Sequence, residues 1–484
     1  MKRIYLFISI VFLFSSCDFL ELDPISEIPA ENMWQNQRDV NAGIADIYAS
    51  FRMALLDNYF FWGEMRSDNF VMNQDTYAEH TKLVNNQLTK ELSCTSWASL
   101  YKVISNANFA IKNIPNANIT DLAMKNDYLA QAYAMRALAY FYAVRVWGDV
   151  PVYTEPVETF EKAEFKPRTP KNTVLSDYIL PDLKKAESLI NPANIERKRI
   201  SRYAIYAITA DVYMWLEDYE SADQTLAKII ENQTYVFQKD MAGMKKTFVE
   251  SLNFKREDND PTKDEYGGNN ELIFVIHHNS AESGLNNYSR IWQILGFGTG
   301  EGSAVILSPT LQAKYSQAKT QGDLRFDNYL MAAKSDNQTF QVHKYIANGS
   351  KVHYTEMKNC QMAYPVYRFT DVILMQAEVK ANLDKWQDAL DILATTVRTR
   401  AGVQISTRPL SSFSSRNELI DYILDEKQIE QAGEGKRWFD LVRTRKAVEV
   451  MNPINGMNDD NQMLFPINQS IVDQNPNLEQ NLGY

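Results

Sequence analysis

The sequence has few of the residues that most often carry redox and metal chemistry. It holds 3 cysteines and 5 histidines in 484 residues. So few cysteines cannot build a disulfide framework, and we expect Cys94 and Cys360 to be two buried free thiols rather than a pair, with pairing as the alternative. His277 and His278 are adjacent in a predicted strand, so they would face opposite sides and could not chelate one metal ion in regular geometry.

The motifs of several enzyme classes are also missing. The chain contains no HExxH, no GxSxG and no CxxC pattern, so the signatures of zinc proteases, serine hydrolases and thioredoxin-like enzymes are absent. The glycine-rich run from Gly296 to Gly302 is no phosphate loop, because no lysine follows it and Glu301 carries the wrong charge. Paired carboxylates for sugar hydrolysis stay open, since the sequence does not show which of its 61 acidic residues face each other.

One acidic stretch raises the question of a cation. Asp258, Asp260, Asp264 and Glu265 lie close together, but the stretch lacks the glycine at the sixth position and the glutamate at the twelfth position of a helix–loop–helix calcium site. We interpret it as a solvated loop. We therefore expect no metal and no cofactor, with a structural calcium ion as the alternative.

Positive charge is in deficit. The chain has 50 Lys and Arg against 61 Asp and Glu, a formal net charge of −11. Such a surface repels phosphates at long range, which excludes nucleic acid as a partner. The chain is 45% hydrophobic and 23% charged, as in globular proteins. Its 26 Tyr, 23 Phe and 8 Trp indicate an aromatic core, with a minority of rings available as platforms for a ligand.

No hydrophobic run is long enough to span a bilayer comfortably, but the N-terminus carries a short one. Lys2 and Arg3 precede an apolar run over residues 4–14, and Phe14-Ser-Ser-Cys17 follows. This order is typical of a bacterial lipoprotein signal, so residues 1–16 are a predicted signal peptide and Cys17 a predicted lipid anchor. Residues 17–30 would form a lipidated tether, held by acyl chains that each contribute about 0.8 kcal/mol per buried CH₂. The alternative is an ordinary secretory signal with an incidental cysteine.

A helical hairpin occurs twice in the chain. In the first copy a helix passes through Ala210 to Leu216, and Tyr219 opens a second helix that carries Ala222. The second copy repeats this pattern at a constant offset, with Ala377, Leu383, Trp386 and Ala389 in the corresponding places. The small alanine lets the two helices approach closely, as in a tetratricopeptide hairpin. Two copies so far apart are not a tandem solenoid, so a long segment must be inserted between them.

The remaining pattern predicts a mainly α protein in one domain over residues 31–484. Tetratricopeptide-like helices are expected over about 38–232 and 366–450. Within them we expect helices at 38–56, near 97–111, from 121 to 148, at 171–190, at 417–433 and at 436–450. The segment over about 234–365 is rich in Gly, Asn, Asp and Ser and should be loop-rich, with a strand at 271–276.

Charged residues recur at helical spacing near the C-terminus. They are Glu426, Lys427, Glu430, Glu434, Arg437 and Asp440, and the last four form the predicted junction. At spacings of three and four, acids and bases meet along and between two helices. We interpret them as a structural ion-pair junction that locks the last helix pair, with a catalytic role as the alternative.

Several segments, taken in order, carry a resemblance to a known family. They are Phe14-Ser-Ser-Cys17, Trp97 to Asn108, Ala130 to Arg136, Trp147-Gly-Asp-Val-Pro151, Tyr367 to Glu378, Glu426 to Glu430, Gly435 to Arg443, Phe465-Pro-Ile, and Asn475-Pro to Gly483-Tyr484. With these the chain resembles the SusD/RagB family of cell-surface, nutrient-binding outer-membrane lipoproteins. The resemblance covers nearly the whole mature chain and is weakest over residues 234–365.

The resemblance implies a function as well as a fold. It implies a scaffold of four tetratricopeptide-like helix pairs with irregular loops on one side. It implies no catalysis, capture of oligosaccharides or peptides by the loops, and delivery to a SusC-like TonB-dependent β-barrel transporter that the scaffold contacts. The expected location is the outer membrane, lipid-anchored and facing the exterior.

Two stretches combine rings with polar groups suited to sugars. Pyranose C–H faces stack on aromatic rings, while hydroxyls take hydrogen bonds from Asp, Asn and Arg. The candidate ligand residues are Trp62, Arg66, Asp68, Asn69 and Tyr77 in the first stretch, and Tyr288, Arg290, Trp292 and Phe297 in the second. The alternative is that Trp62 and Trp292 anchor the core beneath loops. Two other function classes stay open, namely a surface-anchored glycosidase or peptidase and an adhesin or structural scaffold.

Overall fold

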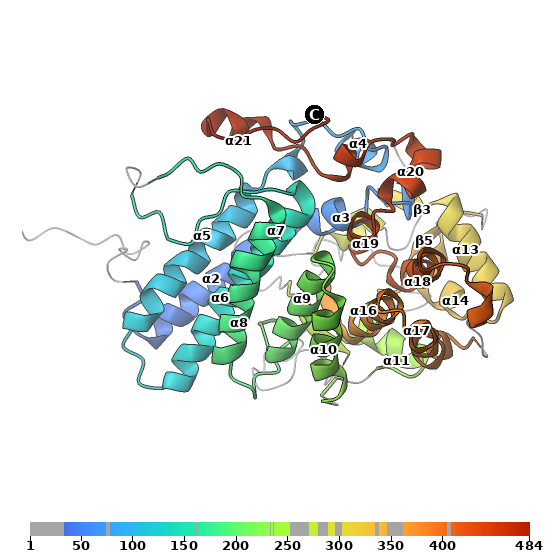
Figure 1. Cartoon of the computed structure of the whole chain (residues 1–484), viewed down its shortest axis with the longest axis horizontal. Coiled ribbons are helices and arrows are strands. Elements are labelled where there is room, and N and C mark those ends of the chain that lie inside the picture. Colours follow the sequence, from blue (N-terminus) through green and yellow to red (C-terminus); the bar gives the residue numbers. More distant parts are fainter. Residues whose placement is uncertain are drawn as a thin grey trace, which may run out of the picture.

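The fold is helical throughout its scaffold. The computed structural model describes residues 33–73, 78–159, 163–232, 234–235, 237–251, 271–278, 289–295, 303–333, 338–345, 362–403 and 408–484. Figure 1 shows the N-terminal group α2, α5, α6 and α8 on one side, the C-terminal group α16, α17 and α18 on the other, and α9 and α10 between them. The predicted mainly α fold is confirmed.

The N-terminal helices match the predicted ranges closely, except that the short helices α3 and α4 were not predicted. They are α2 (Gln37–Ala54), α3 (Asn58–Gly63), α4 (Ala78–Val84), α5 (Ala98–Asn113), α6 (Leu122–Trp147), α7 (Lys171–Thr173) and α8 (Leu180–Leu189), with a π-helical turn Val174–Ile179 joining the last two. Asp121 caps α6 by accepting a hydrogen bond from Met124 N, and Gly148 ends it at φ 73°. Because α6 packs against α2, α5, α8 and α9, its C-terminal half is buried on every face.

The repeated hairpin is confirmed, and the turns of the two copies share the same backbone conformation. The first copy is α9 (Arg202–Trp215) with α10 (Tyr219–Ile230), and the second is α16 (Phe369–Asn382) with α17 (Trp386–Leu393). Glu217 and Asp384 occupy the same place in the two turns, and both have φ 59°. A left-handed residue other than glycine costs about 1 kcal/mol, so the same costly turn occurs in both copies. The two hairpins lie side by side through α10 and α16.

The last helices differ from the prediction in one place. Helix α18 (Arg416–Gln431) is confirmed, but the predicted helix over 436–450 is two helices, α19 (Arg437–Arg443) and α20 (Ala447–Asn455). The break occurs at Arg445, which has φ 60°, while Lys446 N donates to Leu441 O. Helical periodicity continues across this turn, so the sequence pattern alone did not reveal it. Helix α21 (Gln469–Gln474) follows near the C-terminus.

The inserted segment holds more helix than predicted. It contains α11 (Met241–Lys245), α12 (Ile291–Leu295), α13 (Pro309–Thr320) and α14 (Arg325–Tyr329). Ser308 caps α13 by accepting from Leu311 N, with Pro309 at the first position, a start signal that the prediction overlooked. The strands form three antiparallel pairs, β1 (Phe70–Met72) with β3 (Val305–Leu307), β2 (Leu272–Ile276) with β6 (Tyr364–Arg368), and β4 (Leu330–Ala332) with β5 (Phe340–Val342). The predicted strand at 271–276 is confirmed.

One hydrophobic core links these parts. Its buried residues run from Val40 to Leu478, and a smaller cluster surrounds Trp438. Cys94 is a buried free thiol whose pKa is raised by burial, while Cys17 and Cys360 lie outside the described residues. No helix in the described part of the chain has the length and apolarity to cross a membrane.

Candidate functional site

Trp62, the first of the predicted ligand residues, is a core anchor. Its side chain is 0% exposed, and its indole Nε1 donates to Cys94 O at 2.8 Å. Its ring packs edge-on against Trp147 with 5.2 Å between the ring centroids, and Trp147 packs edge-on against Trp97 with 5.7 Å between theirs. A ring without an accessible face cannot stack on a sugar. The structure therefore contradicts a platform role for Trp62.

Arg66 is buried as well. Its guanidinium lies over the rings of Trp438 and Phe465, at 4.2 Å and 4.7 Å from their centroids. Its nitrogens donate to Asn86 Oδ1 at 3.1 Å and to Met463 O at 3.1 Å. Burial lowers the pKa of Arg66 to about 10. This side chain fixes the C-terminal segment to the core instead of facing a ligand.

Asp68 and Asn69 complete this buried group. They are 3% and 1% exposed, and Gln428 Nε2 donates to both at 2.8 Å. Arg437 Nε donates to Asp68 Oδ1 at 2.8 Å. Burial acts to raise the pKa of Asp68, but Arg437 outweighs it and holds the pKa below its usual range. The first predicted stretch is therefore a structural joint between β1, α18 and α19, and its described residues are not placed to bind a ligand.

The second predicted stretch is only partly described. Tyr77, Tyr288 and Phe297 lie outside the described residues. The backbone of Trp292 belongs to α12, but its side chain is not described. Arg290 is half-buried, and its Nη1 donates to Gln293 Oε1 at 3.2 Å. Ligand binding by these residues stays a prediction.

Strand pairing brings the two predicted stretches together. The register of β1 and β3 sets Met72 opposite Val305. Beyond the pair, Asn73 Nδ2 donates to Ser303 Oγ at 3.0 Å, and Ala304 N donates to Gln293 O at 3.1 Å. The segment after β1 thus meets α12 at one edge of the molecule, whereas the sequence suggested two separate places.

A set of half-buried polar residues marks this edge, which we call the loop face: Asn73, Glu79, His80, Arg290 and Gln293. Burial raises the pKa of Asp57 beside it, Glu79 adds to the rise, and Arg290 opposes it. Burial lowers the pKa of His80, against the pull of Glu79. The face offers neutral and charged hydrogen-bonding groups of both polarities, as recognition of hydroxyl groups requires.

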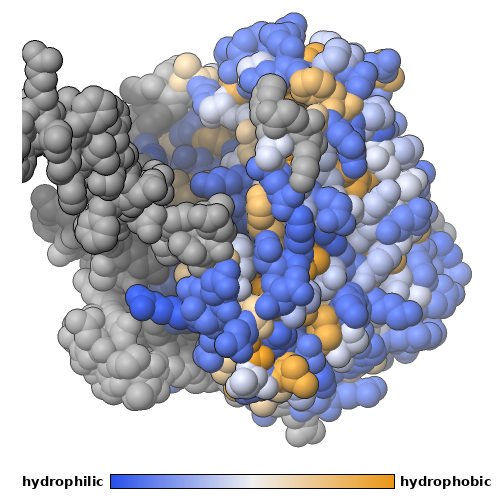
Figure 2. All heavy atoms as spheres, turned by 90° about the vertical axis from the view of Figure 1, so that its left-hand side faces the viewer, coloured by the Kyte–Doolittle hydropathy of each residue, from blue (hydrophilic) through white to orange (hydrophobic). Residues whose placement is uncertain are grey.

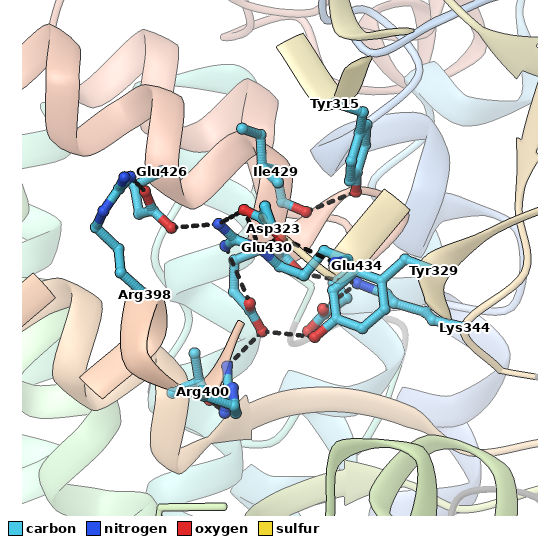
Figure 3. A network of polar contacts seen from close by, with 12 residues as sticks. Tyr315, Asp323, Tyr329, Lys344, Arg398, Arg400, Glu426, Ile429, Glu430 and Glu434 are labelled. Atoms are coloured by element: carbon cyan, nitrogen blue, oxygen red, sulfur yellow. Dashed lines mark hydrogen bonds and ion pairs between the residues drawn. The ribbon is translucent and has the colours of Figure 1, made fainter. Parts of the chain in front are cut away.

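The predicted ion-pair junction is part of a larger buried network (Figure 3). At its centre Glu430 accepts from Arg400 at 2.6 Å and from Arg368 at 3.0 Å. Burial opposes ionisation of Glu430, but Arg400, Arg368 and Arg325 outweigh it and lower its pKa to about 2. Paired and hydrogen-bonded charges of this kind tolerate burial.

The network joins segments that are far apart in the chain. Glu434 accepts from Arg368 at 2.7 Å and also pairs with Lys344. Further pairs, seen in part in Figure 3, are Arg325 with Asp323 and Glu426, Arg398 with Glu426, and Arg368 and Arg400 with Glu271. The junction was expected to lock the last helix pair. Lys427 of α18 does pair with Asp440 of α19, so that lock is present. In addition, Glu430 and Glu434 tie the end of α18 to the inserted segment.

The other two members of the predicted junction face elsewhere. Arg437 pairs with Asp68, and Asp440 pairs with Lys427 at 2.5 Å and Arg443 at 2.8 Å. All four predicted residues make ion pairs, but they belong to three separate groups. Among the described residues no group of three or more His, Cys, Asp or Glu is arranged to hold a metal ion, and the acidic stretch at 258–265 lies outside them.

Sequence reasoning missed one open groove, which we call the α5–α21 groove. It has a volume of about 400 Å³ and is lined by α5, by residues from 151–157 and 163–165, and by the C-terminal segment around α21. Its ring-bearing lining residues are Trp97, Tyr101, Tyr153 and Phe165. Trp97 and Tyr101 are spaced four apart and so lie on one face of the helix predicted near 97–111. This spacing is also typical of residues that face a hydrophobic core, so it did not indicate a groove. Nothing local in the sequence places Phe165 beside them.

Comparisons with known proteins agree on a family. The model of the SusD family matches residues 292–484, and the model described as "Starch-binding associating with outer membrane" matches residues 18–214. The SusD-like protein P38 of Formosa agariphila is 31% identical, over 97% of this chain and 96% of its own length. The SusD-like protein P2 of the same organism is 24% identical over 93% of this chain and 92% of its own length.

Solved structures agree on the fold. A laminarin-binding SusD-like protein superposes with a TM-score of 0.75 at 21% identity, covering 93% of this chain and all of that one. The protein NanU of B. fragilis gives a TM-score of 0.74 at 24% identity, covering 96% of this chain and 100% of its own. The fold and the nearly full-length match to P38 agree with the family models at both ends. The chain belongs to the SusD/RagB family.

Proposed function

We propose that this protein is a lipoprotein of the outer membrane that captures oligosaccharides outside the cell and hands them to a TonB-dependent β-barrel transporter. It is anchored through acylated Cys17 and performs no catalysis of its own. Peptides are the second ligand class for the same role.

The observation that carries this proposal is the match to a SusD-like relative over 97% of the chain. Family models match on both sides of the inserted segment, and the printed description of one of them names starch binding and the outer membrane. A structure with the same fold is named for laminarin binding. Starch and laminarin are both neutral glucans, so we propose a neutral glycan as the ligand.

The loop face is the proposed place of capture. Asn73 and Gln293 supply amide groups there and Arg290 a guanidinium, and β1 and β3 hold them on a rigid base. Such groups take the paired hydroxyls of a sugar. Trp292 would supply the stacking ring, because α12 carries it beside Arg290 and Gln293.

A binding measurement combined with product analysis tests the proposal. The purified full chain is titrated with neutral glucose hexamers of α-1,4 and of β-1,3 linkage, and the solution is then examined by chromatography. We expect saturable binding of at least one hexamer and recovery of that hexamer intact. Shortened sugars would show a glycosidase instead, and absence of binding to both would contradict a glucan as the ligand.

Arg290 provides a variant that locates the site. Arg290→Ala should weaken hexamer binding about tenfold, since hydrogen bonds to a charged group contribute about 1.5–3 kcal/mol. Arg416→Ala is the matched control, because its side chain is 45% exposed and pairs with Asp384 at a distant turn. Equal affinities for the two variants would contradict capture at the loop face.

A further inference from the structure

The α5–α21 groove has a floor that is held rigidly in place. Asn108 Nδ2 donates to Tyr153 O at 3.0 Å, and Tyr140 OH donates to the same oxygen at 2.9 Å. Arg136 Nη1 donates to Asn108 Oδ1 at 2.7 Å and to Thr154 O at 3.0 Å. These bonds fix the segment after Pro151 to α5 and α6, so the groove needs little ordering before it binds a ligand.

The wall that carries Phe165 is held by the C-terminal segment. Asn475 Nδ2 donates to Lys166 O at 3.0 Å, and Asn477 Nδ2 donates to Phe165 O at 2.5 Å. The backbone is thus fixed, yet the ring of Phe165 is 54% exposed. Val157 on the same rim is 42% exposed. Packing does not account for a large ring held in water on a fixed backbone, whereas a stacking surface would.

Several polar groups that line the same groove have no partner among the described residues. Among the described residues, no hydrogen bond involves the indole N–H of Trp97, the hydroxyl of Ser105 or the side-chain amide of Gln474, and all three side chains line the groove. The carboxylate of Glu155 also lines it and makes no ion pair with a described residue. The groove therefore offers three kinds of donor (indole N–H, hydroxyl and amide N–H) and three kinds of acceptor (hydroxyl, amide oxygen and carboxylate) beside an exposed aromatic ring.

Charge and size restrict what can bind there. Glu155 and Glu164 both line the groove, and Glu164 pairs with Lys166 at 3.6 Å. The charge of Glu155, which makes no ion pair with a described residue, disfavours anionic ligands. A volume of about 400 Å³ is within the range of roughly 300–1,000 Å³ that is usual for small-ligand sites. On this side of the molecule the surface is mostly hydrophilic with scattered apolar patches (Figure 2). An isolated groove with a few rings suits a small ligand better than a broad apolar partner.

We infer that the α5–α21 groove is a second binding site for a short neutral saccharide, separate from the loop face. Phe165 stacks on the C–H face of a sugar ring, while Glu155, Gln474 and the indole N–H of Trp97 bond its hydroxyls. The ligand class rests on the proposed function, but the site does not. None of the described loop-face residues lines the groove, and Trp97 at its floor continues through edge-on contacts with Trp147 and Trp62 into the core.

Footprinting of the full chain tests this inference at both places at once. Surface labelling by hydroxyl radicals is measured with and without the α-1,4 and β-1,3 glucose hexamers. We expect at least one hexamer to protect Phe165 and Tyr153 from labelling. Protection of the groove without residues 289–295 would support the inference while contradicting capture at the loop face. Protection of 289–295 alone would overturn the inference and leave the proposed function standing, and protection of neither would overturn both.

Variants give the second measurement. Phe165→Ala should weaken binding at the groove about tenfold, because a stacked ring contributes both apolar area and ring contact. Glu155→Ala should weaken it several-fold through the loss of a hydroxyl acceptor. The unfolding temperature should not change in either case, since both side chains are exposed. Leu324→Ala, 45% exposed and outside the groove, is the control that should bind normally. Normal binding by Phe165→Ala, or protection of Phe165 only by an apolar peptide, would overturn the inference.

Discussion

Aromatic residues in this chain divide by burial into anchors and exposed rings, and the sequence does not separate the two. Trp62 has polar neighbours in the sequence, yet its side chain is 0% exposed and its ring makes a T-shaped contact with Trp147. Phe165 follows an acidic stretch and is 54% exposed. The difference arises from contacts with α6 and with the C-terminal segment, which local sequence does not encode.

This division predicts opposite outcomes for two tryptophan substitutions. Trp292→Ala should weaken hexamer binding with little change in the unfolding temperature, because a platform ring adds little to the core. Trp62→Ala should cost about 3–5 kcal/mol of folding free energy, as expected for a buried ring. Binding titrations and thermal unfolding of both variants check this. Unchanged affinity or a collapse of stability in Trp292→Ala would rule out its role as a platform.

His343 gives a prediction about pH. It is 2% exposed, its Nε2 has no hydrogen-bond partner within the described part of the chain, and burial lowers its pKa to about 4. In the unfolded chain its pKa is about 6.5. Between these two pKa values the unfolded state binds a proton that the folded state does not bind. The free energy of unfolding therefore decreases as the pH falls from about 6.5 towards 4, by about 3 kcal/mol in total.

The test compares the wild type with His343→Leu. The variant should lose less stability between pH 7 and pH 5, measured by urea unfolding at each pH. The slope that remains in the variant reports other groups, including His80, whose pKa burial also lowers. Parallel pH profiles for the two proteins would show that His343 is protonated equally in the folded and unfolded states.

At the scale of the elements, buried ion pairs hold α18 and the inserted segment together, as apolar packing holds other elements together. Helix α18 supplies Glu426 and Glu430, and the inserted segment supplies Arg325 and Lys344. Removing one partner of such a group leaves a buried charge uncompensated. The network therefore makes the position of the inserted segment dependent on α18.

Glu430→Gln tests this dependence. The free energy of unfolding should fall by about 3–5 kcal/mol, because Arg368 and Arg400 lose a shared carboxylate in the interior. Glu449→Gln is the matched control, since Glu449 pairs with Lys446 on the surface at 68% exposure and should contribute less than about 0.5 kcal/mol. A similar small loss in both variants would show that the network does not hold the two parts together.

The elements differ in how far local sequence determines them. The hairpins at α9–α10 and α16–α17 were predictable because alanine, leucine and an aromatic residue recur at fixed spacing. The break at Arg445 and the helix α13 were missed, since one lies within a continuing helical pattern and the other within a glycine-rich and asparagine-rich segment. The pairing of Asp68 with Arg437 joins distant residues and leaves no local signal.

At the scale of the whole molecule, we expect the scaffold and the loop face to have different roles. The repeated hairpins and the α6 group form a rigid body around one core. The loop face and the α5–α21 groove both hold polar groups at partly exposed positions, and core residues such as Trp97 and Ile104 form part of the groove's lining. We therefore expect ligand binding to leave the scaffold unchanged, so that the same surface can stay in contact with a transporter.

Isolation of the full acylated chain from its own outer membrane in mild detergent tests the central claim most directly. We predict that a TonB-dependent β-barrel protein copurifies in stoichiometric amount and stays bound after washing in salt. We also predict that the Cys17→Ala variant, which lacks the proposed acylation site, is lost from the membrane fraction. Recovery of the acylated chain without any barrel protein would contradict its role in delivery to a transporter.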